Sequence, residues 1–228
     1  MFVESDDTER RARVHAALGE PSRLRIVDAL AVADASPHEL ERLVGMPSNL
    51  LAHHLKTLVD AGVVTRSRSE ADRRRTYLRL VPEAVASLAV LPRVVASRVV
   101  FVCTRNTARS QLAKVLWPQY SPVPAASAGT NPAARVHPRA VAVARRHGLR
   151  LPLGETHHVS DVVDDGDLVI AVCDNVHESL SVDIPRWHWS IPDPVAVDTD
   201  EAFELAFADI DRRIDRVAPL LTCRTGMS

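Results

Sequence analysis

Residues 99–102 are all apolar and lead directly into Cys103, where the composition changes abruptly. A polar loop follows, and residues 111–117 then place apolar side chains at helical spacing. This order predicts a buried strand, a tight loop and a helix. Within the loop, Arg109 stands six positions after Cys103, and Ser110 follows the arginine directly. The chain must therefore fold so that this loop joins the end of a strand to the start of a helix.

A loop at the amino end of a helix is suited to binding an anion, because backbone N–H groups converge there. The guanidinium of Arg109 can add a two-pronged contact to oxyanion oxygens. The same positive field favours a thiolate on Cys103, which would face the bound oxyanion as a nucleophile. An isolated cysteine at a strand end is more often a buried apolar residue, but the complete pattern favours catalysis. The predicted oxyanion-binding residues are Thr104, Arg105, Asn106, Thr107, Ala108 and Arg109.

The Cys-x5-Arg-Ser pattern resembles the phosphate loop of low molecular weight protein tyrosine phosphatases and of the arsenate reductases that share their fold. The resemblance extends to the sequence SAGT at residues 127–130 and to the Asp-Pro pair that begins at Asp193. It implies that Cys103 is the nucleophile and that Ser110 stabilises its thiolate. It also implies that Asp193 is the general acid that protonates the leaving oxygen.

Three further loop positions are interpreted through the same resemblance. Asn106 matches a family position that holds the loop conformation. Arg105 stands where relatives often have glycine, and Ala108 stands where some have cysteine. The fine shape of the loop is therefore expected to differ from that of those relatives.

The composition indicates a globular chain with enough apolar residues to form hydrophobic cores. Its 228 residues, 46% of them hydrophobic, allow one large or two small domains, and a net charge of −1 indicates no class of partner. Three cysteines do not make a disulfide framework, so we expect a reducing cytoplasm as the location. The amino terminus is charged rather than apolar, and no apolar run approaches the roughly 18 residues that a membrane span needs. We therefore expect no signal peptide and no membrane association.

The first part of the chain reads as a helix-turn-helix followed by a wing. Residues 8–34 predict two helices broken at a Gly-Glu-Pro-Ser turn, and a capping-box pattern at residues 36–39 opens a third. Residues 49–61 predict a fourth helix, and short strands at 63–65 and 76–80 flank a basic hairpin. Such an arrangement reads DNA, although a run of arginines alone usually just solvates a hairpin tip. The candidate DNA-binding residues are Ser48, Asn49, His53, His54, Lys56, Arg66, Arg68, Arg73, Arg74 and Arg75.

Residues 17–30 and 50–68 resemble the ArsR family of winged-helix repressors, and the resemblance covers about residues 10–90. It implies a homodimer that binds operator DNA and releases it on sensing a metal or metalloid. Residues 1–102 contain no cysteine, and As(III) requires thiolates, so this domain is not expected to bind it alone. Four histidines could ligate zinc, but the adjacent pair among them points to different sides of a helix, so no metal site is predicted; the four are His15, His38, His53 and His54.

The rest of the chain alternates predicted strands and helices. Strands at 123–130, 167–174 and 186–191 are separated by a helix at 137–147 and followed by one at 200–221. The fold class expected is two domains: an α+β winged helix-turn-helix, then an α/β open parallel sheet of the low molecular weight phosphatase type. The expected bounds are 1–92 and 97–228, with a helix over residues 81–97 that breaks near a proline and packs against its counterpart in a dimer. Ligands bind at the carboxyl ends of such strands, and these ends hold Cys103, Cys173 and Asp193.

The resemblance leaves two chemistries open, and the sequence favours arsenate reduction. Tyrosine phosphatases follow the Asp-Pro pair with aromatic residues that flank the substrate ring, whereas residues 195–197 here are Val-Ala-Val. The segment WHWSIPDP is also closer to arsenate reductases. A low molecular weight phosphatase remains one alternative, and a repressor whose second domain only senses an oxyanion remains another. The presence of Cys103, Arg109 and Asp193 together favours an enzyme, because a pure sensor needs no general acid.

The reductant is the least determined part of the prediction. Cys173 matches the second cysteine of thioredoxin-coupled relatives, but residues 175–180, where a third would lie, contain none. Either Cys223 takes that role or a low molecular weight thiol of the mycothiol kind attacks the arsenylated Cys103 directly. A thioredoxin- or glutaredoxin-type reductant stays open as well, and Cys173 could equally be a small buried apolar residue. No tightly bound cofactor is expected.

Overall fold

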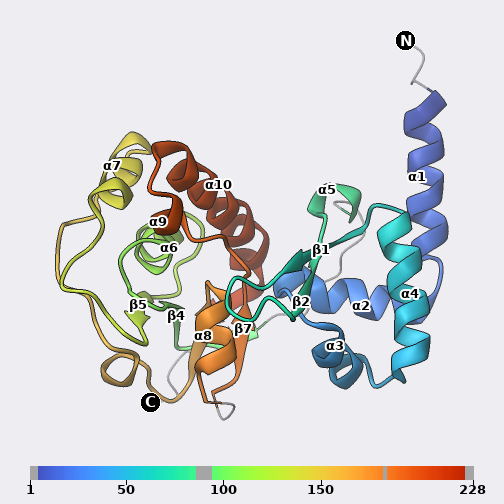
Figure 1. Ribbon diagram of the computed structural model, residues 1–228, viewed down its shortest axis with the longest axis horizontal. Helices are drawn as coiled ribbons and strands as arrows, with labels where there is room; N and C mark the ends of the chain where they lie inside the picture. The colour runs from blue at the N-terminus through green and yellow to red at the C-terminus, as the bar shows by residue number, and fades with distance from the viewer. Residues whose placement is uncertain (1–4, 86–93, 182–183, 224–228) are drawn as a thin grey trace. The chain divides into compact units, whose positions relative to one another are not determined.

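The computed structural model describes residues 5–85, 94–181 and 184–223, and its chain splits into two compact units, Met1–Leu91 and Pro92–Ser228 (Figure 1). Each unit has its own cluster of buried apolar residues. In the described residues no helix is both long and apolar enough to cross a membrane.

The first unit is a bundle of short helices closed by a two-stranded wing. Its elements are α1 (Ser5–Leu18), α2 (Pro21–Val32), α3 (Pro37–Val44), α4 (Ser48–Asp60), β1 (Val64–Arg68), β2 (Thr76–Leu80) and α5 (Pro82–Val85). β1 and β2 pair antiparallel, and Leu78 of β2 also bridges to Ala35, in the link between α2 and α3. Leu30, Leu40 and Leu58 are fully buried where the helices meet. This arrangement confirms the winged helix-turn-helix predicted from the sequence.

Local residue chemistry explains where the helices of this unit begin. The backbone N–H of Ser36 donates to Oε2 of Glu39 over 2.7 Å, and the backbone N–H of Glu39 donates to the hydroxyl of Ser36 over 3.3 Å. This is the predicted capping box, and it satisfies N–H groups that a helix start otherwise leaves without a partner. At the start of α2 the carboxylate of Glu20 accepts from the backbone N–H of Arg23 at 2.9 Å.

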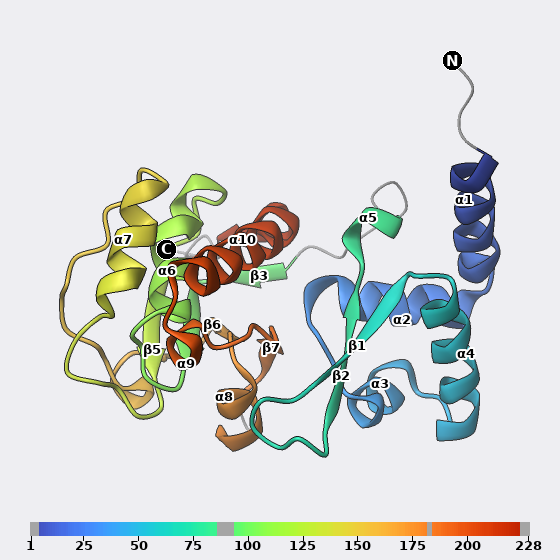
Figure 2. The same cartoon turned by 45° about the horizontal axis from the view of Figure 1, so that its top comes forward.

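The second unit is a parallel sheet with helices packed against it (Figure 2). The strand order is β5-β4-β6-β7, formed by β4 (Arg98–Cys103), β5 (Ala125–Gly129), β6 (Asp167–Ala171) and β7 (Arg186–His188). The helices are α6 (Arg109–Leu116), α7 (Pro138–Arg146), α8 (Asp174–Ser179), α9 (Pro194–Val197) and α10 (Asp200–Val217), with 3-10 turns η1 (Trp117–Gln119), η2 (Val159–Asp161) and η3 (Ala218–Leu220). This is the predicted open parallel α/β sheet.

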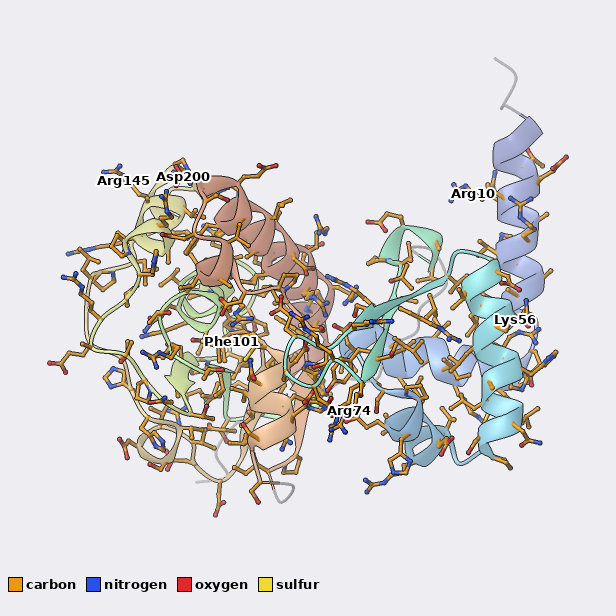
Figure 3. The ribbon with its side chains drawn as sticks, viewed as in Figure 1. Arg10, Lys56, Arg74, Phe101, Arg145 and Asp200 are labelled. Atoms are coloured by element: carbon orange, nitrogen blue, oxygen red, sulfur yellow. The ribbon has the colours of Figure 1, made fainter. Side chains whose placement is uncertain are left out.

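The strand order places a binding crevice at one end of this sheet. β4 is central and pairs with β5 on one side and β6 on the other. The chain leaves β4 toward β5 and later returns to the opposite side of β4 to form β6, and a crevice opens at the carboxyl ends where such connections diverge. Cys103 is the last residue of β4. Phe101, labelled inside this unit in Figure 3, is fully buried two residues earlier, so the strand anchors the loop in the core.

Four sequence-based expectations about elements were wrong. The strand expected at residues 186–191 ends at His188. Residues 94–96, expected in a helix, form strand β3 (Val94–Ala96), which pairs in parallel with β8 (Leu221–Cys223), while residues 86–93 of that expected helix, and with them the expected dimer contact, lie outside the described residues. The last helix ends at Val217 because Pro219, which has no N–H, turns the chain into η3. The strand expected at residues 167–174 ends at Ala171, and the polar residues from Asp174 onward form α8.

Candidate active site

The loop between β4 and α6 is almost entirely enclosed. Cys103 is 3% exposed, Asn106 and Ser110 are fully buried and Arg109 is 5% exposed. Arg105, in contrast, is exposed. Charged side chains are rarely buried unless they are paired. An arginine buried beside a cysteine at a strand end therefore indicates a functional site rather than an ordinary loop.

The carbonyl groups of the loop point outward, toward the segment that follows β5. Four of them accept backbone hydrogen bonds from that segment, in the pairs Cys103–Thr130, Thr104–Asn131, Arg105–Ala133 and Thr107–His137, at 2.8–3.3 Å. In a trans peptide the C=O of one residue and the N–H of the next point in opposite directions, and no peptide bond in the described chain is cis. The N–H groups of the next residues, 104, 105, 106 and 108, therefore point into the loop. N–H groups that converge in this way are suited to binding an anion.

Asn106 fixes the shape of the loop through its side chain. Its backbone has φ 53°, a left-handed conformation that asparagine tolerates better than most residues. Its Oδ1 accepts from Nε2 of Gln111 at 3.1 Å and from the backbone N–H of His157 at 3.0 Å. Its Nδ2 donates to Oγ of Ser110 at 2.9 Å. Both polar atoms of this buried amide are thus used to tie the loop to α6 and to the segment before η2.

Ser110 connects this amide to the candidate nucleophile. Its Oγ lies 3.0 Å from Sγ of Cys103. Because Oγ already accepts from Asn106, its own hydrogen is available to donate to the sulfur. A hydroxyl that donates to sulfur stabilises the thiolate, which is the nucleophilic form of cysteine.

Arg109 joins the loop to the segment that follows β7. One guanidinium nitrogen donates to the carbonyl of Ile191 over 2.8 Å, and another lies 3.1 Å from Oδ2 of Asp193. Asp193 is the cap of α9, where its Oδ1 accepts from the backbone N–H of Val195, and its side chain is 37% exposed. The structure therefore brings the carboxylate of Asp193 beside the guanidinium of Arg109, at the edge of the loop.

The sequence model of the low molecular weight phosphotyrosine protein phosphatase family matches residues 98–222 of this chain. The chain belongs to this family. A helix-turn-helix domain model matches residues 18–67. Both matches confirm the fusion predicted from the sequence; the finer assignment of the first domain to the ArsR family stays a prediction.

Individual relatives match about half of this chain. An arsenate reductase of Bacillus cereus (strain Q1) is 32% identical over 126 residues, which span 51% of this chain and 90% of the relative. An arsenate reductase of Brevibacillus brevis is 30% identical over 125 residues, spanning 52% and 91%. Among solved structures, the arsenate reductase of Archaeoglobus fulgidus DSM 4304 is 31% identical, covers 53% of this chain and 98% of its own, and superposes with a TM-score of 0.47.

Cys173 lies beside the phosphatase-family loop. It is 1% exposed, and its Sγ is 3.7 Å from Oγ1 of Thr104. Burial raises the pKa of the Cys173 thiol, the Arg109 guanidinium lowers it, and the neighbouring Cys103 raises it again. The structure thus brings one of the two candidate redox cysteines to the site.

Cys223 lies elsewhere, so its candidacy as a redox partner of Cys103 was wrong. It ends β8 and pairs with Ala96, which precedes the first residue of β4, whereas Cys103 is the last residue of β4. The whole length of that strand separates the two cysteines, and Cys223 is exposed. The sequence could not place it, because the β3–β8 pairing joins residues far apart in the chain.

Several residues of the site were missed by reasoning from the sequence. Gln111 supports Asn106, and the carbonyl of Ile191 holds Arg109. Thr104 was predicted as an oxyanion-binding residue, but its contact with Cys173 was not. Gly129 was noted only as part of a resembling segment, yet its Cα lies against the loop backbone. Of these, only the polar Gln111 directly after the motif carried a signal that the sequence could have offered.

The candidate DNA-binding residues fall into an exposed set and one exception. The exposed residues of α4 are Ser48, Asn49, His53 and Lys56, and Figure 3 shows Lys56 on this helix. The exposed residues of the wing are Arg66 and Arg68 on β1 and Arg73, Arg74 and Arg75 in the hairpin. His54 is the exception and its prediction as a DNA contact was wrong. It is 7% exposed, and its Nδ1 lies 3.6 Å from the carboxylate of Glu20, because its side of α4 packs on the start of α2.

Two acidic residues, Glu70 and Asp72, share the wing hairpin with the arginines. Arg74 donates to both carboxylate oxygens of Asp72, from Nε at 3.0 Å and from a terminal nitrogen at 3.3 Å, and Arg75 lies 3.9 Å from the same group. These charges hold the pKa of Asp72 below its usual range, with the Arg74 hydrogen bond as the largest cause. Part of the positive charge of the wing is thus neutralised within the hairpin.

Proposed function

We propose that this chain is a thiol-dependent arsenate reductase with a fused DNA-binding regulatory domain. The observation that carries the proposal is the hydrogen-bonded Cys103–Ser110 pair inside a loop whose N–H groups point inward, with Arg109 and Asp193 at its mouth. Relatives that are 30–32% identical over nearly their whole length and are named arsenate reductases support it.

Each residue of the site has a role in the first half-reaction. Arsenate, a tetrahedral oxyanion, lies on the N–H groups of the loop and on Arg109. Sγ of Cys103 attacks arsenic, Asp193 protonates the departing oxygen, and that oxygen leaves as water. The product is an adduct in which Cys103 sulfur is bonded to As(V).

The second half-reaction requires another thiol. A thiolate attacks Sγ of Cys103, an S–S bond forms, and the S–As bond breaks with its electron pair going to arsenic, which becomes As(III). We assign this thiolate to Cys173 or to a small external thiol of the mycothiol kind. A thiol reductant, either such a small thiol or a thioredoxin- or glutaredoxin-type protein, then restores the enzyme. We place this cycle in the cytoplasm, where free cysteines persist.

A direct assay tests the activity. The purified chain should convert arsenate to arsenite when a reductant is supplied, and the assay compares a thioredoxin system, a glutathione–glutaredoxin system and mycothiol. An aryl phosphate assayed in parallel tests the phosphatase alternative. If none of the reductants yields arsenite and an oxyanion changes DNA binding, the second domain is a sensor and the proposal is overturned.

Asp193→Asn tests the general acid. The amide cannot donate the proton that the leaving oxygen needs, so hydrolysis of a phosphate monoester with a poor leaving group should fall by about 10²-fold. Phosphate binding should persist, since the N–H groups of the loop and Arg109 stay in place. The measurement is steady-state kinetics with leaving groups of graded basicity. A variant that cleaves the poorest leaving group as fast as the parent chain would assign Asp193 another role.

The first domain is proposed to act as an ArsR-type repressor. Paired winged helices present two recognition helices to a two-fold symmetric operator, so we propose a homodimer. The exposed residues of α4, Ser48, Asn49 and His53, would face base edges, and the wing arginines would face phosphates.

Replacing the hairpin arginines tests this assignment. The Arg73→Ala, Arg74→Ala and Arg75→Ala triple variant should bind all DNA sequences more weakly, and the slope of log affinity against log salt should shrink by about 0.9 for each phosphate that the variant no longer neutralises. Asn49→Ala should instead relax sequence preference. Arg145→Ala, an exposed arginine of the other unit labelled in Figure 3, is the matched control and should leave the affinity unchanged. Equal decreases in affinity for the triple variant and for Arg145→Ala would contradict the wing contact.

A further inference from the structure

We propose that Arg186 and His188 of strand β7 are positioning residues that hold Cys173 beside the Cys103 loop for the second thiol step. The proposal rests on the proposed arsenate reduction, in which a thiolate must attack Sγ of Cys103. It assigns that attack to Cys173 and explains what keeps this cysteine in place.

The position of Cys173 depends on helix α8. Cys173 is the residue that caps this helix, with extended backbone angles of φ −163° and ψ 154°. The helix has six residues, and a helix this short has little stability of its own in water. Contacts from elsewhere in the fold must therefore hold it. Figures 1 and 2 both show α8 lying beside β7.

Arg186 holds the carboxyl end of α8. One terminal nitrogen of its guanidinium donates to the carbonyls of His177 at 2.7 Å and Leu180 at 3.1 Å, and the other donates to those of Ser181 at 2.8 Å and Ile184 at 3.1 Å. The last carbonyls of a helix have no partner inside it, and a cation is favoured at this end. A single side chain from β7 therefore binds the end of α8 and the turn after it.

His188 holds the opposite end of the helix. Its Nε2 lies 3.0 Å from Oδ1 of Asp174, the first residue of α8, and the two side chains are 1% and 2% exposed. The same imidazole stacks on the ring of His177, with centroids 4.1 Å apart and ring planes 6° from parallel. Polar groups this deeply buried are costly to separate, so the contact fixes Asp174 and with it the neighbouring Cys173.

The strand register brings the two cysteines close together. Val102 pairs with Ala171, and the N–H of Val172 donates to the carbonyl of Val102 at 2.8 Å, so the ladder continues one residue further. Cys103 then lies opposite Val172, and Cys173 is one residue beyond. Strand spacing and rise put the two cysteine Cα atoms about 6 Å apart, inside the Cα range of a disulfide. Successive side chains of a strand point to opposite faces, so the bond also requires a rotation of the chain where β4 and β6 end. The Thr104–Cys173 contact at 3.7 Å agrees with this register.

The step balances as a two-electron exchange. The Cys173 thiol loses its proton to solvent, its thiolate attacks Sγ of the arsenylated Cys103, and the Cys103–Cys173 bond forms. The S–As bond breaks, and its electron pair converts As(V) to As(III). Residues 175–181 contain no cysteine, so the disulfide remains in this pair until an external thiol reduces it.

The experiment measures disulfide formation between Cys103 and Cys173 in the full chain carrying Cys223→Ser. One arm uses arsenate without reductant, and the other uses a diazene oxidant that needs no arsenate; both are followed by mass spectrometry. Arg186→Ala should slow disulfide formation by about 10²-fold in both arms, the size expected for a displacement of about 1 Å. Arg186→Lys, which keeps the charge but not the fork, and His188→Gln should give smaller decreases.

Two controls separate positioning from general damage. Alkylation of Cys103 and its protection by phosphate should be unchanged in each variant, since the loop is intact. Arg98→Ala removes a guanidinium that binds the carbonyl of Val162 and the carboxylate of Asp167 around the amino end of β6, and it should leave the disulfide rate unchanged.

Each outcome is decisive. Parent-like disulfide rates in the Arg186 and His188 variants would overturn the inference, and if Arg186→Ala does not fold, Arg186→Lys and His188→Gln decide. A slower oxidant-driven rate in a chain that never reduces arsenate would sustain the positioning role while the proposed function fails.

Discussion

Cys103→Ser is expected to reduce arsenate turnover by at least about 10³-fold, because the hydroxyl of serine is far less ionised and less nucleophilic than a thiolate held by Ser110. The cradle of N–H groups and Arg109 remains in this variant, so oxyanion affinity should persist. The measurement is arsenite release under single-turnover conditions, alongside phosphate binding by calorimetry. Residual turnover within tenfold of the parent chain would show that Cys103 is not the nucleophile.

Alkylation of the three cysteines supplies an independent check of the same assignment. Cys103 should react readily at neutral pH, and arsenate or phosphate should protect it because the anion covers its sulfur. Cys223, which is exposed and separated from the site by the length of β4, is the internal control and should receive no protection. Cys173 should react slowly, since burial raises its pKa and leaves little thiolate at pH 7, and its rate should increase as the pH is raised. Equal protection of Cys103 and Cys223 would contradict an oxyanion site at the loop.

The parts of the fold that could be predicted from the sequence are those determined by neighbouring residues. The capping box at Ser36 and the turn before Pro21 set helix starts through contacts three residues apart. The apolar run into Cys103 predicts a buried strand of the parallel sheet for the same reason, because residues 99–103 of β4 are buried on both faces.

The parts that could not be predicted depend on pairing between distant segments. Nothing near Val94 indicates that it will pair with Leu221, and so residues 94–96 were expected to be helical. The burial of His54 depends on α4 packing against Glu20, 34 positions earlier, so its neighbours in the sequence gave it the same polar context as His53.

The candidate site divides in the same way. The motif itself, Cys103 with Arg109 and Ser110, is contiguous and could be predicted with its chemistry. The contacts that shape it come from far along the chain: Asp193 and Ile191 reach Arg109, and the N–H of His157 reaches Asn106. The family resemblance supplied Asp193, whereas backbone groups such as the Ile191 carbonyl leave no trace in the sequence because any residue carries them.

Gly129→Ala is expected to lower arsenate turnover by about 10³-fold. A Cβ atom at this position would lie 2.8 Å from the carbonyl oxygen of Thr104 and 3.0 Å from the backbone nitrogen of Asn106. Both are backbone atoms of the anion-binding loop, so neither can rotate away, and the loop itself must move. A shift of about 1 Å misplaces the nucleophile, at about 10²-fold, and also misdirects the N–H groups that bind the oxyanion, which lowers turnover further.

Gly154→Ala is the matched control for this substitution. A Cβ there would meet nothing closer than Cγ of Pro152 at 3.9 Å, an ordinary contact, so turnover should stay at the parent level. Overpacking at Gly129 should also lower the free energy of unfolding by about 1–3 kcal/mol, and chemical denaturation measures this separately from activity. Phosphate affinity distinguishes loop displacement from simple destabilisation, since only a displaced cradle weakens binding in the folded chain. If Gly129→Ala kept both phosphate affinity and turnover, the loop would have to be able to yield at Thr104 and Asn106. The contacts that Asn106 makes with Ser110, Gln111 and His157 argue that it cannot.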